Sequence, residues 1–361
     1  MFTRRSWLTS VGGMWGASAL QAQRGTEPVT APEPMDFAPI VPNEKRSLVT
    51  VRTGEERRRI AREALEGIDS QIRTGWKGKK YVLIKPNNVS TQNQLASTHV
   101  DTLRGILDYL DGRWKGEVVI AESSAGQTME GFENFLYPRL AGEYKRLRVK
   151  LVDLNAEAEY RLTHLLTPDL HVQPVRLAAR MLDPESYQIC AAILKTHNTV
   201  IATQSVKNMT LGAPIHYKPG ETPRWNDKRK YHGGVRQTHY NMFLTAAKLK
   251  PYWGATLIDG WEGMEGNGPA SGTPVPTRAA IASTDYIAAD RVGLELMGID
   301  PNWIGYLRYC HQNGIGQYDM ARIDVDGPQL ATVARKYRLH KDIERELEWM
   351  GPLRDLPPKL G

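Results

Sequence analysis

Cysteine is scarce in this sequence. Cys190 and Cys310 are the only two among 361 residues, and both lie in apolar surroundings, which favours buried free thiols over a disulfide. Two cysteines cannot by themselves supply the four thiolates that an iron–sulphur cluster normally needs, so we expect no such cluster. Neither H-E-x-x-H nor C-x-x-C occurs, which excludes the commonest zinc motifs.

Long apolar runs are missing as well. No stretch reaches the roughly eighteen consecutive apolar residues that predict a transmembrane helix, so we expect no stable membrane span. The formal net charge is +7, but the basic residues are scattered along the chain. A cleft for small acidic ligands accounts for this excess as well as a nucleic acid would, and we expect no nucleic-acid partner.

Two catalytic patterns are incomplete. Ser123 and Ser124 follow an apolar segment but lack the G-x-S-x-G elbow of serine hydrolases. The glycine-rich run at 266–272 has the spacing G-x-G-x-x-x-G instead of the G-x-G-x-x-G of dinucleotide-binding folds, and Pro269 removes an amide that would face phosphate. The sequence therefore favours neither a serine hydrolase nor a dinucleotide enzyme.

The N-terminus has the features of an export signal. Arg4 and Arg5 form a twin-arginine pattern, a weakly apolar segment follows at 8–20, and small residues offer cleavage sites near Ala19 or Ala22. We therefore predict a twin-arginine signal peptide at 1–22, the twin-arginine export machinery as a partner, and a periplasmic or otherwise exported mature protein. The proline-rich residues 23–46 are predicted to form an extended linker.

From residue 47 onward, segments of strand length alternate with segments of helical periodicity. This alternation predicts an α/β fold: a mostly parallel sheet with helices on both faces, in a single large domain at 47–327. A charged tail at 328–361 is predicted to be helical from Lys336 to about Met350. The predicted strands are 48–51, 81–84, 116–121, 149–154, 170–177, 187–194, 255–258, 279–282 and 323–325, and the predicted helices are 54–72, 100–110, 129–144 with an interruption near Pro138, 241–249, 286–297 starting near Asp285, and 303–311.

Polar side chains follow the carboxyl ends of several predicted strands. The apolar run at 189–194 ends in Lys195 and His197, and Lys207 and Asn208 come soon after. Buried cations and amides are costly unless something binds them, and ligands of parallel α/β sheets bind beyond the carboxyl ends of the strands. We therefore predict a cleft for a small anion at this edge. The predicted catalytic residues are His197, Glu122 and Lys195, and the predicted substrate-binding residues are Lys85, Asn87, Lys207, Asn208, Asp259 and Glu265.

The chemistry of these residue types supports this division. Lysine neutralises a carboxylate or phosphate, and an amide orients it. His197 is a candidate base or metal ligand, and Glu122 a second acid–base candidate. A divalent metal stays open as a cofactor, with His197, His232 and His239 as candidate ligands, against the alternative that these histidines lie in solvent. The long polar loop at 213–238 has the length of a functional lid.

An ordered set of short motifs resembles the domain-of-unknown-function 362 family. The similarity covers about residues 47–327, and it implies that the polar positions above, together with Asp290, are characteristic of the family. Some members resemble fusions with a ferredoxin-type iron–sulphur domain, whose cysteines are absent here, so no cluster is implied. The motifs are L-I-K-P-N at 83–87, A-E-S at 121–123, L-K-T-H at 194–197, V-K-N at 206–208, I-D-G at 258–260 and M-E-G-N-G-P at 264–269.

Three functions are compatible with these residues. The leading hypothesis is an exported enzyme that acts on a small anionic substrate, with or without a divalent metal. The second is a periplasmic ligand-binding or redox-accessory protein that uses the same cleft without catalysis. The third is a buried polar network that holds no ligand at all.

Overall fold

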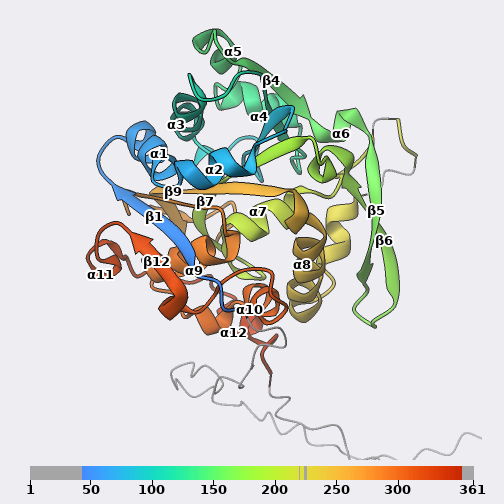
Figure 1. Ribbon diagram of the computed structural model, residues 1–361. Coiled ribbons are helices and arrows are strands. Elements are labelled where there is room, and N and C mark those ends of the chain that lie inside the picture. Colours follow the sequence, from blue (N-terminus) through green and yellow to red (C-terminus); the bar gives the residue numbers. More distant parts are fainter. Residues whose placement is uncertain (1–42, 219, 223–225, 352–361) are drawn as a thin grey trace, which may run out of the picture. The chain divides into compact units, whose positions relative to one another are not determined.

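The computed structural model describes residues 43–218, 220–222 and 226–351 (Figure 1). The predicted signal peptide, and residues 23–42 of the predicted linker, lie outside the described residues. Among the residues described, no helix combines the length and apolar character that crossing a membrane requires.

A ten-stranded mixed sheet organises the fold. Its main strands lie in the order β12-β1-β11-β9-β7-β2-β3-β4. The five neighbours from β9 to β4 are parallel, whereas β11 runs antiparallel to both β9 and β1. The predicted mostly parallel sheet is therefore confirmed. The bounds are β1 Ser47–Thr53, β2 Tyr81–Lys85, β3 Glu117–Glu122, β4 Arg148–Asp153, β7 Ser186–His197, β8 Ile201–Thr203, β9 Trp253–Glu265, β10 Thr273–Val275, β11 Ala279–Ser283 and β12 Ile323–Asp326.

Strand β7 lies inside the parallel part of the sheet, between β2 and β9. All twelve of its residues are buried, as expected for an apolar strand that is covered on both faces. Successive side chains point to opposite faces. Accordingly, Ile189 and Ala191 join one hydrophobic core, while Cys190 and Ala192 join the other.

Helices cover both faces of the sheet, as predicted (Figure 1). One core contains residues of α1, α2 and α3, and the other contains residues of α7, α8, α9 and α10. Asp285 caps α9 as predicted, because its carboxylate accepts hydrogen bonds from two backbone amides of the first turn. The bounds are α1 Arg57–Glu66, α2 Asp69–Gly75, α3 Val100–Leu110, α4 Thr128–Asn134, α5 Arg139–Glu143, α6 Leu154–Glu157, α7 Ser205–Gly212, α8 Val235–Leu249, α9 Tyr286–Met297, α10 Gly305–Gln312, α11 Leu330–Val333 and α12 Ile343–Leu347.

Three local differences from the sequence predictions have physical causes. The predicted helix 54–72 is broken at Gly67, where an added Cβ would lie 2.4 Å from Thr50 Cγ2, so the chain passes close to β1. The predicted irregular strand at 170–177 is one arm of an antiparallel hairpin of β5 (Tyr160–Leu166) and β6 (Val172–Ala178). In the tail, residues 334–340 between α11 and α12 are non-helical, and Tyr337 is buried with its hydroxyl bonded to Thr277.

Candidate functional site

A cavity of about 520 Å³ opens at the carboxyl ends of β2, β3 and β7. Helix α7 forms a further wall. Residues around Lys228 in the loop between α7 and α8, and Arg345 of α12, also line the cavity. This is the edge of a parallel sheet at which ligands bind in such folds. The charged and polar lining residues are Lys85, Asn87, Asn88, Glu122, Ser123, Ser124, His197, Asn198, Thr199, Lys207, Asn208, Asn226, Lys228, Arg229, His232 and Arg345.

Lys85, at the end of β2, is buried and fully hydrogen-bonded. Its Nζ donates to Glu122 Oε2 at 2.9 Å, to Asn208 Oδ1 at 2.8 Å and to the carbonyl of Pro86 at 2.8 Å. An ammonium group has three protons, so all of its donors are used. The close approach of α7 requires Gly212, since a Cβ there would lie 2.1 Å from Lys85 Cε.

Glu122, at the end of β3, balances the charge of Lys85. Its Oε2 also accepts the backbone N–H of Asn88 at 3.0 Å, and its Oε1 accepts the N–H of Ser123 at 2.8 Å. Each oxygen therefore already has a protein donor. This pairing makes Glu122 a fixed counter-charge in the cavity floor.

Asn208 and Asn87 extend the network beneath the cavity. Asn208 Oδ1 accepts a hydrogen bond from Asn87 Nδ2 at 3.0 Å, in addition to the one from Lys85. Asn87 Oδ1 in turn accepts from Lys195 Nζ at 2.7 Å. A continuous chain of hydrogen bonds thus joins β7, β2, α7 and β3.

Lys195 lies in this network and does not line the cavity. It is wholly buried, and its Nζ donates to Asn87 Oδ1 and to the carbonyl of Ala96, each at 2.7 Å. Burial, and then Lys207, lower the pKa of Lys195 well below its ordinary value. The geometry does not support the predicted catalytic position of Lys195, because its side chain is not part of the cavity lining.

Lys207 does face the cavity, and it has a different environment. Its side chain is 5% exposed, yet its amine makes no hydrogen bond or ion pair with any of the described residues. Burial lowers the pKa of Lys207 to about 7; the positive charge of Lys85 lowers it further, and Glu122 opposes this effect. Neutral and charged forms of this amine therefore coexist near neutral pH.

Lys228 is the second cation on the cavity wall, and the sequence reasoning did not select it. Its Nζ donates to Ser123 Oγ at 3.0 Å and to the carbonyl of Leu211 at 2.8 Å. Burial of the amine lowers the pKa of Lys228 to about 7. One of the three donors of the ammonium form remains for a ligand. Lys228 lies in the polar loop between α7 and α8, where no local pattern distinguishes it from Lys218 or Lys230.

His197 ends β7 at the cavity. Its Nδ1 accepts the backbone N–H of Thr199 at 3.1 Å, which assigns the proton of the neutral ring to Nε2. Burial, and then the charge of Lys207, lower the pKa of His197 well below its ordinary value. The ring is therefore a neutral donor toward the cavity. His232 also lines the cavity, near its exposed rim.

His239 does not belong to this site. It is buried in α8, its Nδ1 accepts the N–H of Tyr306, and its ring stacks on Tyr306 and packs against Trp349. Within the described part of the chain, no group of three His, Cys, Asp or Glu side chains has the arrangement of a metal site. Of the candidate ligands, His197 and His232 both line the cavity, whereas His239 does not.

Asp259 and Glu265, both on β9, also lie outside the cavity. Asp259 accepts hydrogen bonds from Thr102 and from the N–H of Trp261, and it pairs with Arg57 at 3.2 Å. Glu265 accepts the N–H of Arg338 at 2.8 Å. Their positions near a strand end made them candidates, but their side chains serve local structure.

Asp290 anchors the helix that carries Lys207. It is wholly buried in α9, and its two oxygens accept the backbone N–H groups of Ser205 at 2.8 Å and Val206 at 3.0 Å. Burial raises the pKa of Asp290 to about 7, while these hydrogen bonds oppose the shift. The partner of this buried carboxyl is thus the N-terminus of α7, without a cationic side chain.

Comparison with known proteins identifies a family. Residues 82–295 match the family described as "Domain of unknown function (DUF362)". No curated protein sequence gives a significant match. Two solved structures are similar: the lactate racemase apoprotein from Thermoanaerobacterium thermosaccharolyticum, at 14% identity, TM-score 0.43 and coverage of 71% of this chain, and a structural-genomics protein from Thermotoga maritima, at 10% identity, TM-score 0.40 and coverage of 73%. The chain spans 57% and 59% of those two chains.

Proposed function

The chain belongs to the DUF362 family, and because that description names no activity, we propose its function from the cavity: an enzyme that acts on a small anionic substrate. Lys207 is the reactive group, and Lys228 and His197 hold the substrate beside it. The floor of the site consists of Lys85, Glu122, Asn87 and Asn208, which also line the cavity.

The observation that carries this proposal is the unpaired amine of Lys207 in the cavity wall. A buried lysine usually has protein acceptors, because an ammonium without them loses its hydration and gains nothing in return. Lys207 has no such acceptor among the described residues, whereas the neighbouring lysines do. An anion in the cavity would supply the missing partner.

The charge balance of the cavity supports an anionic ligand. Among the lining residues that the structure describes, Glu122 is the only carboxylate, and Lys85 already pairs with it. Among the described residues, Lys207 and Lys228 form no ion pair. Arg229 adds positive charge to the lining, and so does Arg345, which pairs with Asp342 at 3.4 Å. Low-dielectric walls of one sign concentrate ligands of the opposite sign.

The volume suits a small molecule. A cavity of about 520 Å³ lies in the range of ordinary ligand sites. Lys228 offers a donor that its two protein acceptors leave unused, and the Nε2–H of His197 offers a second. These groups fit a carboxylate or a phosphate group, with Lys207 adjacent to the rest of the molecule.

Calorimetric titration with inorganic phosphate, propionate and malonate tests the binding part of this proposal. We expect at least one of these anions to bind to the wild-type protein and none to bind comparably to Lys207→Met. Incubation with a panel of organic acids and phosphate esters, followed by NMR, tests catalysis. Anion binding without conversion of any compound would favour the alternative, a ligand-binding protein without catalysis.

We also propose that the protein acts after export. Support comes from the sequence alone. Three features of an export signal follow one another along the chain: Arg4 and Arg5, the weakly apolar segment at 8–20, and the small residues near Ala19 and Ala22. A periplasmic substrate would then be a small anion that reaches that compartment.

A further inference from the structure

The three lysines of the cavity differ in what their amines contact. Lys85 Nζ donates three hydrogen bonds and Lys228 Nζ donates two, all to protein oxygens. Within the described residues, Lys207 Nζ donates none, although it lines the same cavity. Lys85 must break one of its three hydrogen bonds before its amine can present a lone pair to a ligand. Neutral Lys228 keeps a lone pair beside its two hydrogen bonds, but these bonds hold its amine in place. Among the described residues, the amine of Lys207 is held by no such bond.

The groups beside Lys207 are suited to bind a molecule with two oxygen functions. The Nε2–H of His197 is a neutral donor, because Nδ1 is held by the N–H of Thr199. Lys228 has a remaining donor in its charged form. One of these can hold a carbonyl oxygen, while the other holds an anionic group.

Resting on the proposed function, we propose that Lys207 forms an imine with the carbonyl carbon of a small aldehyde or ketone that also carries a carboxylate or phosphate. The substrate class is thereby narrowed from small anions to anionic carbonyl compounds. Imine formation is the same whether the anionic group is a carboxylate or a phosphate, so the two are distinguished by testing one carbonyl compound of each kind.

The reaction balances without any further reactant. The lone pair of Lys207 Nζ forms a bond to the carbonyl carbon, and the π electrons of the C=O bond move to the oxygen. Nitrogen then loses both of its protons to that oxygen, the C–O bond breaks, and water leaves. The product is a C=N bond between Lys207 and the substrate, with no change in oxidation state.

Burial also keeps the nucleophile in its reactive form. The pKa of Lys207 is lowered to about 7, so much of the amine is neutral at that pH. Lys228, with a pKa lowered to about 7, must be protonated to hold the anion. Lys85 lowers and Glu122 raises the pKa of Lys207. The charge of Lys207 in turn lowers the pKa of Lys195, His197, Lys228 and His232. We expect adduct formation to be fastest near pH 7 and to decline on either side.

Reductive trapping tests the imine directly. The wild-type protein is incubated with sodium cyanoborohydride and either pyruvate or dihydroxyacetone phosphate, and intact and peptide mass spectrometry then locate the reduced adduct. We expect one adduct per chain, on Lys207, with at least one probe. The probe that reacts identifies the carboxylate or the phosphate as the anionic group.

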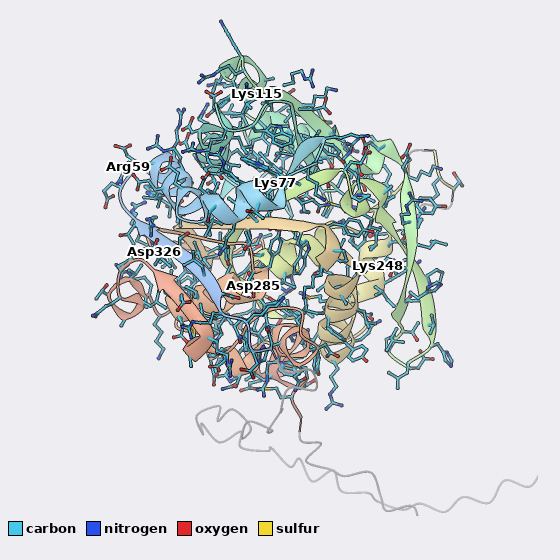
Figure 2. The ribbon with its side chains drawn as sticks, viewed as in Figure 1. Arg59, Lys77, Lys115, Lys248, Asp285 and Asp326 are labelled. Carbon is cyan, nitrogen blue, oxygen red and sulfur yellow. The ribbon has the colours of Figure 1, made fainter. Side chains whose placement is uncertain are left out.

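Matched variants separate charge from nucleophilicity. Lys207→Arg keeps a cation but cannot form the adduct, so we expect trapping to be lost while propionate or glycerol 3-phosphate, which lack the carbonyl, still binds. Lys248→Met, on the exposed face of α8 (Figure 2), is expected to trap as wild type does.

Each contrary result is informative. Binding of propionate or glycerol 3-phosphate without any adduct would overturn the imine and leave the proposed anion site standing. An adduct on another lysine, or equal trapping by Lys207→Arg, would also overturn it. Absence of both anion binding and trapping in the wild-type protein would overturn the proposed function together with the inference.

Discussion

Lys85 Nζ donates a hydrogen bond of 2.8 Å to Asn208 Oδ1, and this contact joins the central strand β2 to helix α7. Asp290 holds the N-terminus of the same helix through the N–H groups of Ser205 and Val206. The helix is thus fixed at its N-terminus and near its middle. Lys207, adjacent to Asn208, faces the cavity from a rigid support, which is a requirement for an accurately positioned reactive group.

The contact between Gly212 and Lys85 predicts a destabilising substitution. In Gly212→Ala the new Cβ would lie 2.1 Å from Cε and 2.3 Å from Nζ of Lys85, whose three hydrogen bonds oppose its displacement. We expect the free energy of unfolding to fall by about 1–3 kcal/mol in urea denaturation. Gly142→Ala, with no atom within 4 Å of its added Cβ, is the control and should leave stability unchanged or slightly raised. Equal stability of the two variants would contradict the close packing of α7 on β2.

Lys195 is predicted to stabilise the fold and not to bind the ligand. Lys195→Met removes the donor for Asn87 Oδ1 and for the carbonyl of Ala96, and both acceptors stay buried. We expect a loss of about 1–3 kcal/mol in the free energy of unfolding. At a temperature where the variant is folded, its affinity for anions should change far less than that of Lys207→Met. If Lys195→Met has the stability of the wild type but no longer binds anions, this prediction is wrong and Lys195 is a ligand-binding residue.

Anion affinity is predicted to depend on pH in one direction. Lys207 and Lys228 have pKa values lowered to about 7 in the free protein, and a bound anion favours their charged forms. Binding should therefore take up protons at and above pH 7, and affinity should decrease as pH rises through this range. Calorimetry in two buffers of different ionisation enthalpy measures the uptake. Proton release on binding, or affinity that is constant from pH 6 to pH 9, would count against the two lysines as ligands.

Export is predicted to require both N-terminal arginines. Replacement of Arg4 and Arg5 by lysine keeps the charge but removes the pattern of the twin-arginine signal. We expect the double variant to remain inside the cell in its uncleaved form, as measured by fractionation and N-terminal mass analysis. A matched variant with Arg24→Lys, beyond the predicted cleavage sites, should be exported normally. An unchanged exported yield of the double variant would refute the signal.

The sequence predicted the fold well where periodicity was strong. The apolar run of β7 and the alternating strands and helices lead to a mostly parallel sheet, because few other arrangements bury such segments. Polar residues at strand ends also led to the correct edge, where Lys85, Glu122 and His197 line one cavity.

The sequence pattern could not predict which of these polar side chains point into the cavity. Lys195 and Lys207 have equal chemical character in the sequence, but Lys195 bonds to the carbonyl of Ala96 outside the cavity lining, whereas Lys207 faces the cavity. Asp259 follows a predicted strand end, as Glu122 does, yet it lies within β9 and pairs with Arg57 from α1. Lys228 reaches the cavity through tertiary packing of a loop, which leaves no periodic signal.

The stability and anion affinity of Lys207→Met, compared with Lys248→Met, test the central claim most directly. Lys207→Met removes a buried amine that has no bond to any described residue, so its melting temperature should equal or exceed that of the wild type. Its affinity for the anion that binds the wild type should fall by about tenfold or more, or about 1.4 kcal/mol. Lys248→Met, at an exposed position of α8, should change neither quantity. Wild-type anion affinity in Lys207→Met would contradict the account.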